Sequence, residues 1–233
     1  MKKIGFIGMY DKTDLILNIA KILTTMHKKV IVVDSTITQK AKYVVPVINP
    51  TVTYITDFED IDVAVGFKNE NEIKNYLGIS ETEPLPYDIM LVDVDNEQGL
   101  SEFELMSNEI KNYFVTAFDL YSLKRGLEIL STVKTPMALT KILFAKEILK
   151  EEDDYLNFLS LGYKIMWNEY RIYFPIENGD WSVLAENQRV AKIKLKKLST
   201  QYKDSLIYIV SEILNDTSEN QIRKAVKTIE RGV

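Results

Sequence analysis

The amino-terminal part of the chain reads as a strand, a helix and a second strand, and this pattern constrains the fold more than any other feature. Residues 3–7 form a short, largely apolar run, and residues 13–26 carry apolar side chains at helical spacing. Residues 30–34 form a β-branched run that is typical of a strand covered on both faces. A strand–helix–strand unit of this kind has a right-handed crossover. The sequence therefore predicts a parallel sheet.

The rest of the chain continues the alternation of strands and helices. Further strands are predicted at 61–65, 87–93, 112–116, 138–144 and 172–175, and helices at 70–77, 120–130, 203–214 and 219–231. Residues 44–55, which include Pro46 and Pro50, are predicted to be a loop with short extended pieces. We expect an α/β fold with a doubly wound, mainly parallel sheet and helices on both faces, built as a single domain over residues 1–233.

Composition removes several classes of function. The chain has 233 residues and a net charge of −5. It contains no cysteine, and this absence excludes disulfides, zinc–thiolate sites and thiol catalysis. Its single histidine, His27, lies beside two lysines where a helix should end, and we interpret it as a surface turn residue. The sequence shows neither a signal peptide nor an apolar stretch long enough to span a membrane, so we expect a soluble, cytoplasmic protein.

The loop between the first strand and the first helix has features of a phosphate-binding loop. It reads Ile7-Gly8-Met9-Tyr10-Asp11-Lys12-Thr13. A lysine at the mouth of a helix offers positive charge to phosphate, and a threonine hydroxyl after it can coordinate Mg²⁺. We take Gly8, Asp11, Lys12 and Thr13 as candidate nucleotide-binding residues, with Thr13 as a candidate metal ligand.

Two acids follow buried strands in the same part of the predicted sheet. Asp34 ends the second strand, and Asp93 ends the strand at 87–93. Ligands of open parallel sheets bind beyond the carboxyl ends of the strands. Asp34 and Asp93 are therefore candidate catalytic residues, and Asp93 is also a candidate Mg²⁺ ligand. The alternative interpretation is that each acid only caps the loop that follows it.

The order of these segments resembles the ParA/MinD family of deviant Walker-A ATPases. The family loop reads K-G-G-x-G-K-T, and Gly8, Lys12 and Thr13 match it here. Asp34 corresponds to the first acid of the family's V-D-x-D motif, and the segment 87–93 is similar to its Y-D-x-I-I-I-D strand. The segment 119–127 resembles the stretch before a helix near the family's dimer interface. The resemblance covers roughly the first 140 residues and implies ATP and Mg²⁺ as cofactors, a homodimer and a bacterial protein.

The departures from the family pattern are as informative as the matches. Ile7 replaces the signature lysine that reaches the partner's nucleotide, and Met9 and Asp11 replace two glycines. Glycines let a loop approach phosphate closely, and a carboxylate there would repel it. We therefore expect a degenerate Walker A loop with weak or no hydrolysis, in a localisation or assembly scaffold similar to the TadZ/CpaE group. The alternative is a functional Mg-ATP-dependent ATPase whose loop tolerates Asp11.

Two basic segments raise further alternatives. A DNA-associated, partition-type protein could use a cluster of basic residues, namely Arg189, Lys192, Lys194, Lys196 and Lys197. The helix at 219–231 is basic and amphipathic, as in MinD relatives that lie on membranes, but its apolar face lacks Leu, Phe and Trp, so we expect it to pack on the protein. Region 153–182 concentrates aromatic residues, most of which we expect in the core. A Rossmann-like module using Gly5 and Gly8 is disfavoured because a third glycine is missing.

Overall fold

The sheet has eight strands in the order β3-β4-β2-β5-β1-β6-β7-β8. This computed structural model describes residues 1–48, 51–147 and 150–232. All strand pairs are parallel except β3 with β4. The strands are β1 (Lys2–Ile7), β2 (Val30–Asp34), β3 (Tyr54–Phe58), β4 (Ile61–Val65), β5 (Ile89–Val94), β6 (Lys111–Ala117), β7 (Met137–Ala145) and β8 (Ile165–Pro175). The predicted fold class is confirmed.

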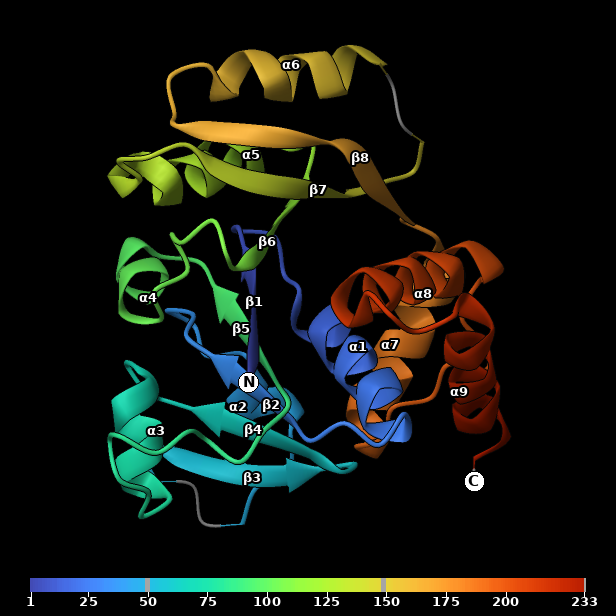
Figure 1. Cartoon of the computed structure of the whole chain (residues 1–233). Helices are drawn as coiled ribbons and strands as arrows, with labels where there is room; N and C mark the ends of the chain where they lie inside the picture. The colour runs from blue at the N-terminus through green and yellow to red at the C-terminus, as the bar shows by residue number, and fades with distance from the viewer. Residues whose placement is uncertain (49–50, 148–149, 233) are drawn as a thin grey trace.

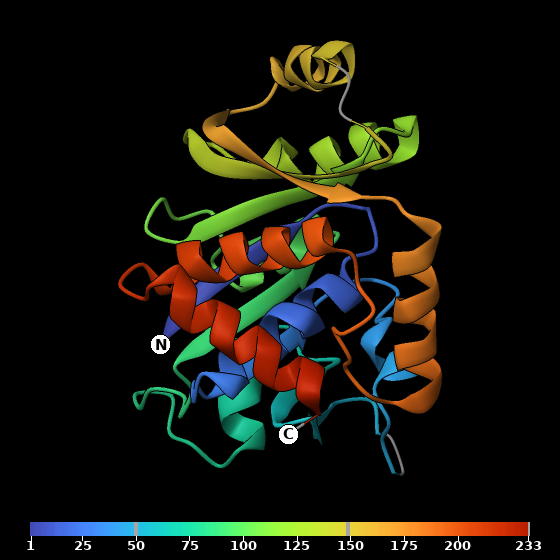
Figure 2. The same ribbon diagram turned by 90° about the vertical axis from the view of Figure 1, so that its right-hand side faces the viewer.

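Helices cover both faces of the sheet. Figure 1 shows α1, α7, α8 and α9 on one side and α3, α4 and α5 on the other, while α6 lies beyond β8. Turning the molecule brings α1, α8 and α9 to the front (Figure 2). The helices are α1 (Thr13–Thr25), α2 (Ala41–Val44), α3 (Glu70–Tyr76), α4 (Glu97–Glu102), α5 (Leu120–Glu128), α6 (Lys150–Ser160), α7 (Asn178–Val190), α8 (Thr200–Leu214) and α9 (Glu219–Arg231), with a 3-10 turn at Ile129–Thr132.

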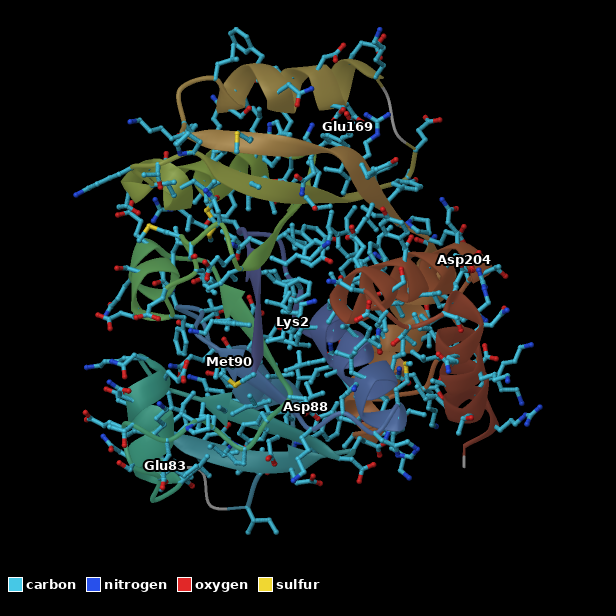
Figure 3. The ribbon with its side chains drawn as sticks, in the orientation of Figure 1. Lys2, Glu83, Asp88, Met90, Glu169 and Asp204 are labelled. Carbon is cyan, nitrogen blue, oxygen red and sulfur yellow. The ribbon has the colours of Figure 1, made fainter. Side chains whose placement is uncertain are left out.

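The core divides into two apolar layers because the central strands are covered on both faces. Side chains such as Ile4, Ile16 and Leu206 fill the layer under α1, α8 and α9. Ile7, Leu100 and Leu127 belong to the layer under α3, α4 and α5. The side chains in Figure 3 fill the space between the sheet and its helices, with Glu169 on β8 and Glu83 beyond α3 at opposite ends of the molecule.

Several sequence predictions of local structure were wrong. The loop predicted at 44–55 is confirmed for the described residues between α2 and β3, apart from Val44 at the end of α2, but the antiparallel pairing of β3 with β4 was missed. Pro50, with residue 49, lies outside the described residues. Helices α4, α6 and α7 were not predicted, and β8 begins at Ile165 rather than 172. Most of these elements lie at the edges of the fold, where apolar periodicity is weakest.

The aromatic region 153–182 is less buried than predicted. Phe174 is fully buried, but Phe158, Tyr170 and Trp181 are exposed. These side chains are exposed because β8 is an outermost strand of the sheet and α6 packs beyond it. Both elements therefore have a face in contact with solvent.

The C-terminal helix packs on the protein as predicted. Ile222, Ala225, Val226 and Ile229 are buried, and α9 contacts α1 and α8. The apolar face on which a membrane-surface role depends is therefore already covered. Within the described parts of the chain, no helix has the length and apolar character needed to cross a membrane.

Candidate nucleotide site at the carboxyl edge of the sheet

The loop between β1 and α1 crosses the carboxyl edge of the sheet at its centre. Gly8 has a φ of +145°, and a Cβ at this position would lie 2.1 Å from the carbonyl oxygen of Val115 on β6. Only glycine allows this close approach of two backbones. The first glycine of the loop therefore has a structural role that does not depend on any ligand.

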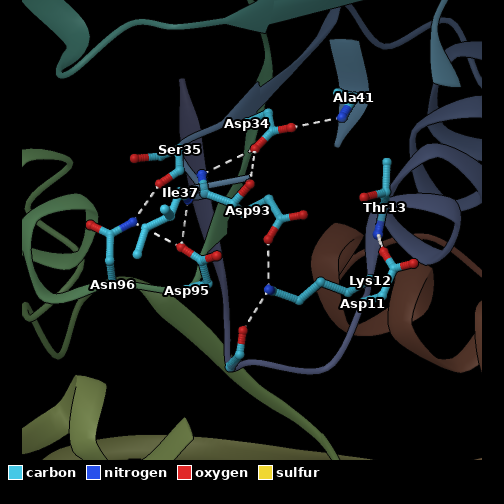
Figure 4. A network of polar contacts seen from close by, with 12 residues as sticks. Asp11, Lys12, Thr13, Asp34, Ser35, Ile37, Ala41, Asp93, Asp95 and Asn96 are labelled. Carbon is cyan, nitrogen blue, oxygen red and sulfur yellow. Dashed lines mark hydrogen bonds and ion pairs between the residues drawn. The ribbon is translucent and has the colours of Figure 1, made fainter. Parts of the chain in front are cut away.

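Lys12 points inward rather than toward solvent. Its Nζ lies 2.7 Å from Asp93 Oδ1 and donates a hydrogen bond of 2.8 Å to the carbonyl oxygen of Gly8. The lysine side chain is 3% exposed. Figure 4 shows this arrangement, with Lys12 reaching from the start of α1 under the loop to β5. The lysine that would hold phosphate is thus engaged with two groups of its own chain.

The environment of Asp93 disfavours its charged form. Burial raises the pKa of Asp93 to about 7, and the neighbouring carboxylates of Asp34 and Asp11 act in the same direction, while Lys12 opposes them. Oδ1 accepts no well-aligned hydrogen bond, although the distance to Lys12 is that of an ion pair. We regard the pair as electrostatic, because the distance is short and both groups are buried.

Asp34 lies next to Asp93 but faces its own loop. The two residues are register partners on β2 and β5. Asp34 Oδ1 accepts from Thr36 N (3.0 Å) and Thr36 Oγ1 (2.6 Å), and Oδ2 accepts from Ala41 N (2.8 Å). The acid therefore shapes the segment 35–41. The interpretation of Asp34 as a loop cap describes its observed contacts, and a catalytic role for it stays a prediction.

Both carboxylate oxygens of Asp11 have partners within the chain. Its Oδ1 accepts a 3.2 Å hydrogen bond from Thr13 N, and its Oδ2 pairs with Lys40 from the segment after β2. Among residues 9–12, none has a positive φ. Asp11 therefore does not take the left-handed conformation that a glycine at this position would allow. A phosphate-binding nest needs alternating right- and left-handed residues, and this loop lacks them beyond Gly8.

Thr13 is buried in the first turn of α1, beside Lys12 and Asp11. The side chain of Thr13 does not cap the helix; the N-cap position is Lys12, and Asp11 binds Thr13 N instead. Among the residues that the structure describes, no group of three or more acidic or histidine side chains could hold a metal ion. A Thr13–Mg²⁺ contact would depend on phosphate for further ligands.

Three residues of this edge were missed or underrated from the sequence. Lys40 pairs with Asp11 although 29 positions separate them. Asp95 Oδ1 accepts from Ile37 N (2.8 Å), and Asn96 Nδ2 donates to Ser35 O (2.7 Å), so the loop after β5 fixes the loop after β2 (Figure 4). The sequence signal for Asp95 and Asn96 is their position directly after a buried strand. Lys40 carries no such signal.

Asp14, in the first turn of α1, adds another carboxylate near the carboxyl edge of the sheet. Burial raises the pKa of Asp14 to about 6, with Lys40 opposing and Asp11 reinforcing the shift. Gln188 Nε2 on α7 donates a 2.7 Å hydrogen bond to Asp14 Oδ2. Asp11, Asp14, Asp34, Asp93 and Asp95 therefore outnumber Lys12 and Lys40 at this edge. The residues present do not fit a triphosphate well, because the mouth of the loop is acidic.

Solved structures share this fold at low sequence identity. One is a chain of the MinC:MinD cell division protein complex of Aquifex aeolicus, at 14% identity, 94% and 97% coverage of the two chains and a TM-score of 0.58. A ParA family ATPase from Chlorobium tepidum TLS gives 14% identity, 91% and 98% coverage and a TM-score of 0.55. The ATP complex of Cyanothece McdA gives 12% identity, 94% and 98% coverage and 0.54.

The similarity extends over nearly the whole chain, beyond the segment of about 140 residues in which the sequence motifs lie. No protein-family model matches the sequence, and no curated protein matches it. The shared architecture gives this chain the fold of the ParA and MinD ATPases.

Proposed function

We propose that this chain is a degenerate ParA/MinD-like protein that acts through protein contacts, as a localisation or assembly scaffold, with weak or no ATP hydrolysis. The main support for the proposal is that Lys12 Nζ already forms an ion pair with Asp93 and a hydrogen bond with the carbonyl oxygen of Gly8. To hold a β- or γ-phosphate, Lys12 would have to leave Asp93 as an uncompensated buried carboxylate. Breaking a buried ion pair in this way costs about 3–5 kcal/mol.

The loss of the signature lysine supports the same proposal. Ile7 is fully buried in β1, beside Val94 of β5. Ile7 packs in the core and has no charged group that could reach a second nucleotide across a dimer. The transition state of phosphoryl transfer would then lack one of its positive charges, and a single electrostatic donor of this type is worth about 3–4 kcal/mol.

Exposed apolar residues near the loop between β1 and α1 support a homodimer in which the carboxyl edges of the two sheets face each other. Leu120 and Tyr121 at the start of α5 are 56% and 64% exposed, and Ile37 is 69% exposed. Ile37 follows β2 and Leu120 follows β6, so both residues lie at the carboxyl edge with Lys12. Apolar and aromatic side chains that gather at one edge are typical of an interface core.

Two measurements test this proposal together. Phosphate release from Mg-ATP should not differ between the wild type and Lys12→Ala, and light scattering after gel filtration should give a dimer without nucleotide. The double variant Leu120→Glu/Tyr121→Glu should be monomeric, whereas Tyr43→Glu, at a position on α2 that is 77% exposed, should stay dimeric. Hydrolysis that depends on Lys12 would support the ATPase alternative, and a wild-type monomer would remove the proposed interface.

One observation keeps the DNA-associated alternative open. In the segment after α7, Ile193, Leu195 and Leu198 are buried, and the residues between them are exposed. Its basic residues, with the last turn of α7, are turned to solvent: Arg189, Lys192, Lys194, Lys196 and Lys197. A gel shift with short duplex DNA that weakens with salt and in the triple alanine variant of Lys194, Lys196 and Lys197 would favour this function, and no shift at low salt would exclude it.

A further inference from the structure

Helix α6 is amphipathic in the opposite sense to a typical surface helix. A helix that packs on a sheet ordinarily turns its apolar side inward and its polar side to solvent. The buried residues of α6 are Asp153, Leu156 and Ser160, so two of the three are polar. Tyr155 and Phe158, by contrast, are 39% and 67% exposed. The outward side of α6 therefore carries its aromatic residues.

Polar contacts with the sheet fix this orientation of α6. Lys141 Nζ on β7 donates to Asp153 Oδ1 (2.7 Å) and to Asn157 Oδ1 (2.6 Å). Trp167 Nε1 on β8 donates to Ser160 Oγ (2.9 Å). A rotation of the helix that buried its aromatic side chains would leave the ammonium group of Lys141 buried without these partners, which is costly. The aromatic residues are thus held at the surface.

The exposed residues on this side form one continuous surface, the outer face of α6: Glu151, Asp154, Tyr155, Phe158 and Leu161. Glu151 precedes Tyr155 by four positions, and Asp154 precedes Phe158 by four, and side chains at this spacing are neighbours on a helix. Leu161 directly follows the helix and is 79% exposed. In both Figure 1 and Figure 2, α6 forms one end of the molecule, and no drawn helix or strand lies beyond it.

The outer face of α6 carries negative charge that the chain itself does not balance. Asp153 has two cationic partners, whereas neither Glu151 nor Asp154 forms an ion pair with any of the residues that the structure describes. Lys150 is the only basic residue of the helix. Two carboxylates therefore lie beside the exposed aromatic side chains without a partner of opposite charge.

These two properties select the kind of partner that fits. Exposed aromatic residues are typical of the core of a protein interface, and apolar anchors at helical spacing are typical of contacts with an amphipathic helix. Lysine or arginine side chains of such a helix would form charge-assisted hydrogen bonds with Glu151 and Asp154. A second copy of α6 would instead bring the same carboxylates to this surface, where like charges repel. A helix with an apolar side and basic flanks is complementary to both properties.

We propose that the outer face of α6 binds a basic amphipathic helix of another protein. The apolar side of that helix packs on Tyr155, Phe158 and Leu161, and its basic side chains pair with Glu151 and Asp154. The outer face extends for about 15 Å along the helix axis, so the partner helix needs about three turns. This inference rests on the scaffold function proposed above for the need of a protein partner, and it does not depend on the homodimer.

Fluorescence anisotropy with a labelled model peptide tests the proposal. The probe is an amphipathic helix of leucine and lysine, and its counterpart has glutamate in place of each lysine. The wild type should bind the lysine peptide at least about tenfold more tightly than the glutamate peptide. Tyr155→Ser/Phe158→Ser should weaken binding of the lysine peptide by at least about tenfold. The matched control, Tyr43→Ser/Tyr76→Ser, removes two exposed aromatic residues from α2 and α3 and should bind as the wild type does.

Charge reversal separates the acids of the outer face from the negative charge of the whole chain. Glu151→Lys/Asp154→Lys should bind the glutamate peptide more tightly than the lysine peptide. Glu81→Lys/Glu83→Lys makes the same change in net charge at exposed positions between α3 and β5, and it should keep the preference of the wild type. Thermal melting verifies that each variant is folded. Because Glu151 and Asp154 are exposed, this arm tests the proposal even if the aromatic double variant does not fold.

Different results would overturn the proposal in different ways. It is wrong if the wild type does not bind the lysine peptide at about 0.1 mM, or if the two charge reversals have equal effects. Light scattering should give the same molar mass for the wild type and Tyr155→Ser/Phe158→Ser, and a lower mass for the variant would assign the outer face to a second copy instead. Hydrolysis that depends on Lys12, together with peptide binding, would remove the scaffold function and leave this surface in place.

Discussion

Lys12 Nζ lies 2.7 Å from Asp93 Oδ1, so the lysine of the candidate phosphate-binding loop is paired with the acid of the candidate Walker-B-like strand. Both side chains are buried. The pair joins the start of α1 to β5 and draws the lysine away from the mouth of the loop. This single contact links the stability of the fold to its capacity to bind nucleotide.

The first prediction concerns the pH dependence of this pair. The folded-state pKa of Asp93, about 7, lies above the ordinary value of 3.8, so the folded chain retains a proton between these values that the unfolded chain has lost. Stability contributed by Asp93 therefore falls as pH rises through this window. Lys12 opposes the shift, so Lys12→Met should raise the pKa further.

Lys12→Met should destabilise the protein more at pH 8 than at pH 5.5, by about 3–5 kcal/mol at the higher pH. Denaturant unfolding at the two pH values measures the difference. Lys28→Met, at an exposed position after α1, serves as the control and should change stability little at either pH. A Lys12→Met effect that is equal at both pH values would show that Asp93 is not the group coupled to Lys12.

The second prediction concerns Asp14, whose folded-state pKa is about 6. Between its ordinary value and about 6, this residue also makes the fold less stable as pH rises. Asp14→Asn keeps an acceptor for Gln188 and removes the charge. The variant should lose the part of the pH dependence between 5 and 7 that belongs to Asp14, with a difference of about 1–2 kcal/mol between these pH values. Denaturant unfolding of both proteins gives this difference directly, and parallel pH profiles would contradict the assignment.

A third prediction tests whether Asp11 limits phosphate binding. Asp11→Gly removes a carboxylate from the loop, restores a family glycine and frees Lys40 from its ion pair. Affinity for Mg-ATP should increase by at least about tenfold, because like-charge repulsion at short range costs a few kcal/mol. Asp216→Gly, at an exposed site between α8 and α9, is the matched control and should leave affinity unchanged. Equal affinity in the wild type and Asp11→Gly would show that the lost glycine and the added charge are not limiting.

The fourth prediction concerns the attachment of α6 to the sheet. Lys141 Nζ on β7 lies 2.7 Å from Asp153 Oδ1 and 2.6 Å from Asn157 Oδ1, and it is buried. Arg171 pairs with the other oxygen of Asp153 but is 44% exposed. Lys141→Met should therefore destabilise the protein by about 3–5 kcal/mol, and Arg171→Gln by less than about 1 kcal/mol.

Chemical denaturation compares these two variants, because both remove one cation from the same carboxylate. Amide hydrogen exchange should show that protection is lost first in α6 for Lys141→Met. Equal destabilisation by the two variants would mean that burial does not decide the strength of these pairs.

The sequence predicted the centre of the fold because buried parallel strands have a strong signal. Continuous β-branched or apolar runs marked β2 and β5, and the acids that follow them, Asp34 and Asp93, occupy paired positions in the sheet. Short or exposed elements such as α2, β3 and α6 lack this signal, and their positions depend on contacts with distant parts of the chain.

The details of the candidate site could not be predicted for the same reason. The pairing of Lys40 with Asp11 depends on the path of residues 35–40, which Asp95 and Asn96 fix from the loop after β5. The inward orientation of Lys12 depends on the depth of Asp93 beside the loop. Both are tertiary relationships, and neither residue spacing nor propensity contains them.

Isothermal titration of the wild type with Mg-ATP, repeated with Lys12→Ala, tests the central claim most directly. The claim is that the ion pair with Asp93 keeps Lys12 from binding phosphate, at a carboxyl edge of the sheet where acidic side chains outnumber lysines. We predict no Mg-ATP binding in the micromolar range, and a heat of binding that is equally small or undetectable in both proteins. Micromolar binding in the wild type that disappears in Lys12→Ala would contradict the account and identify a working nucleotide site.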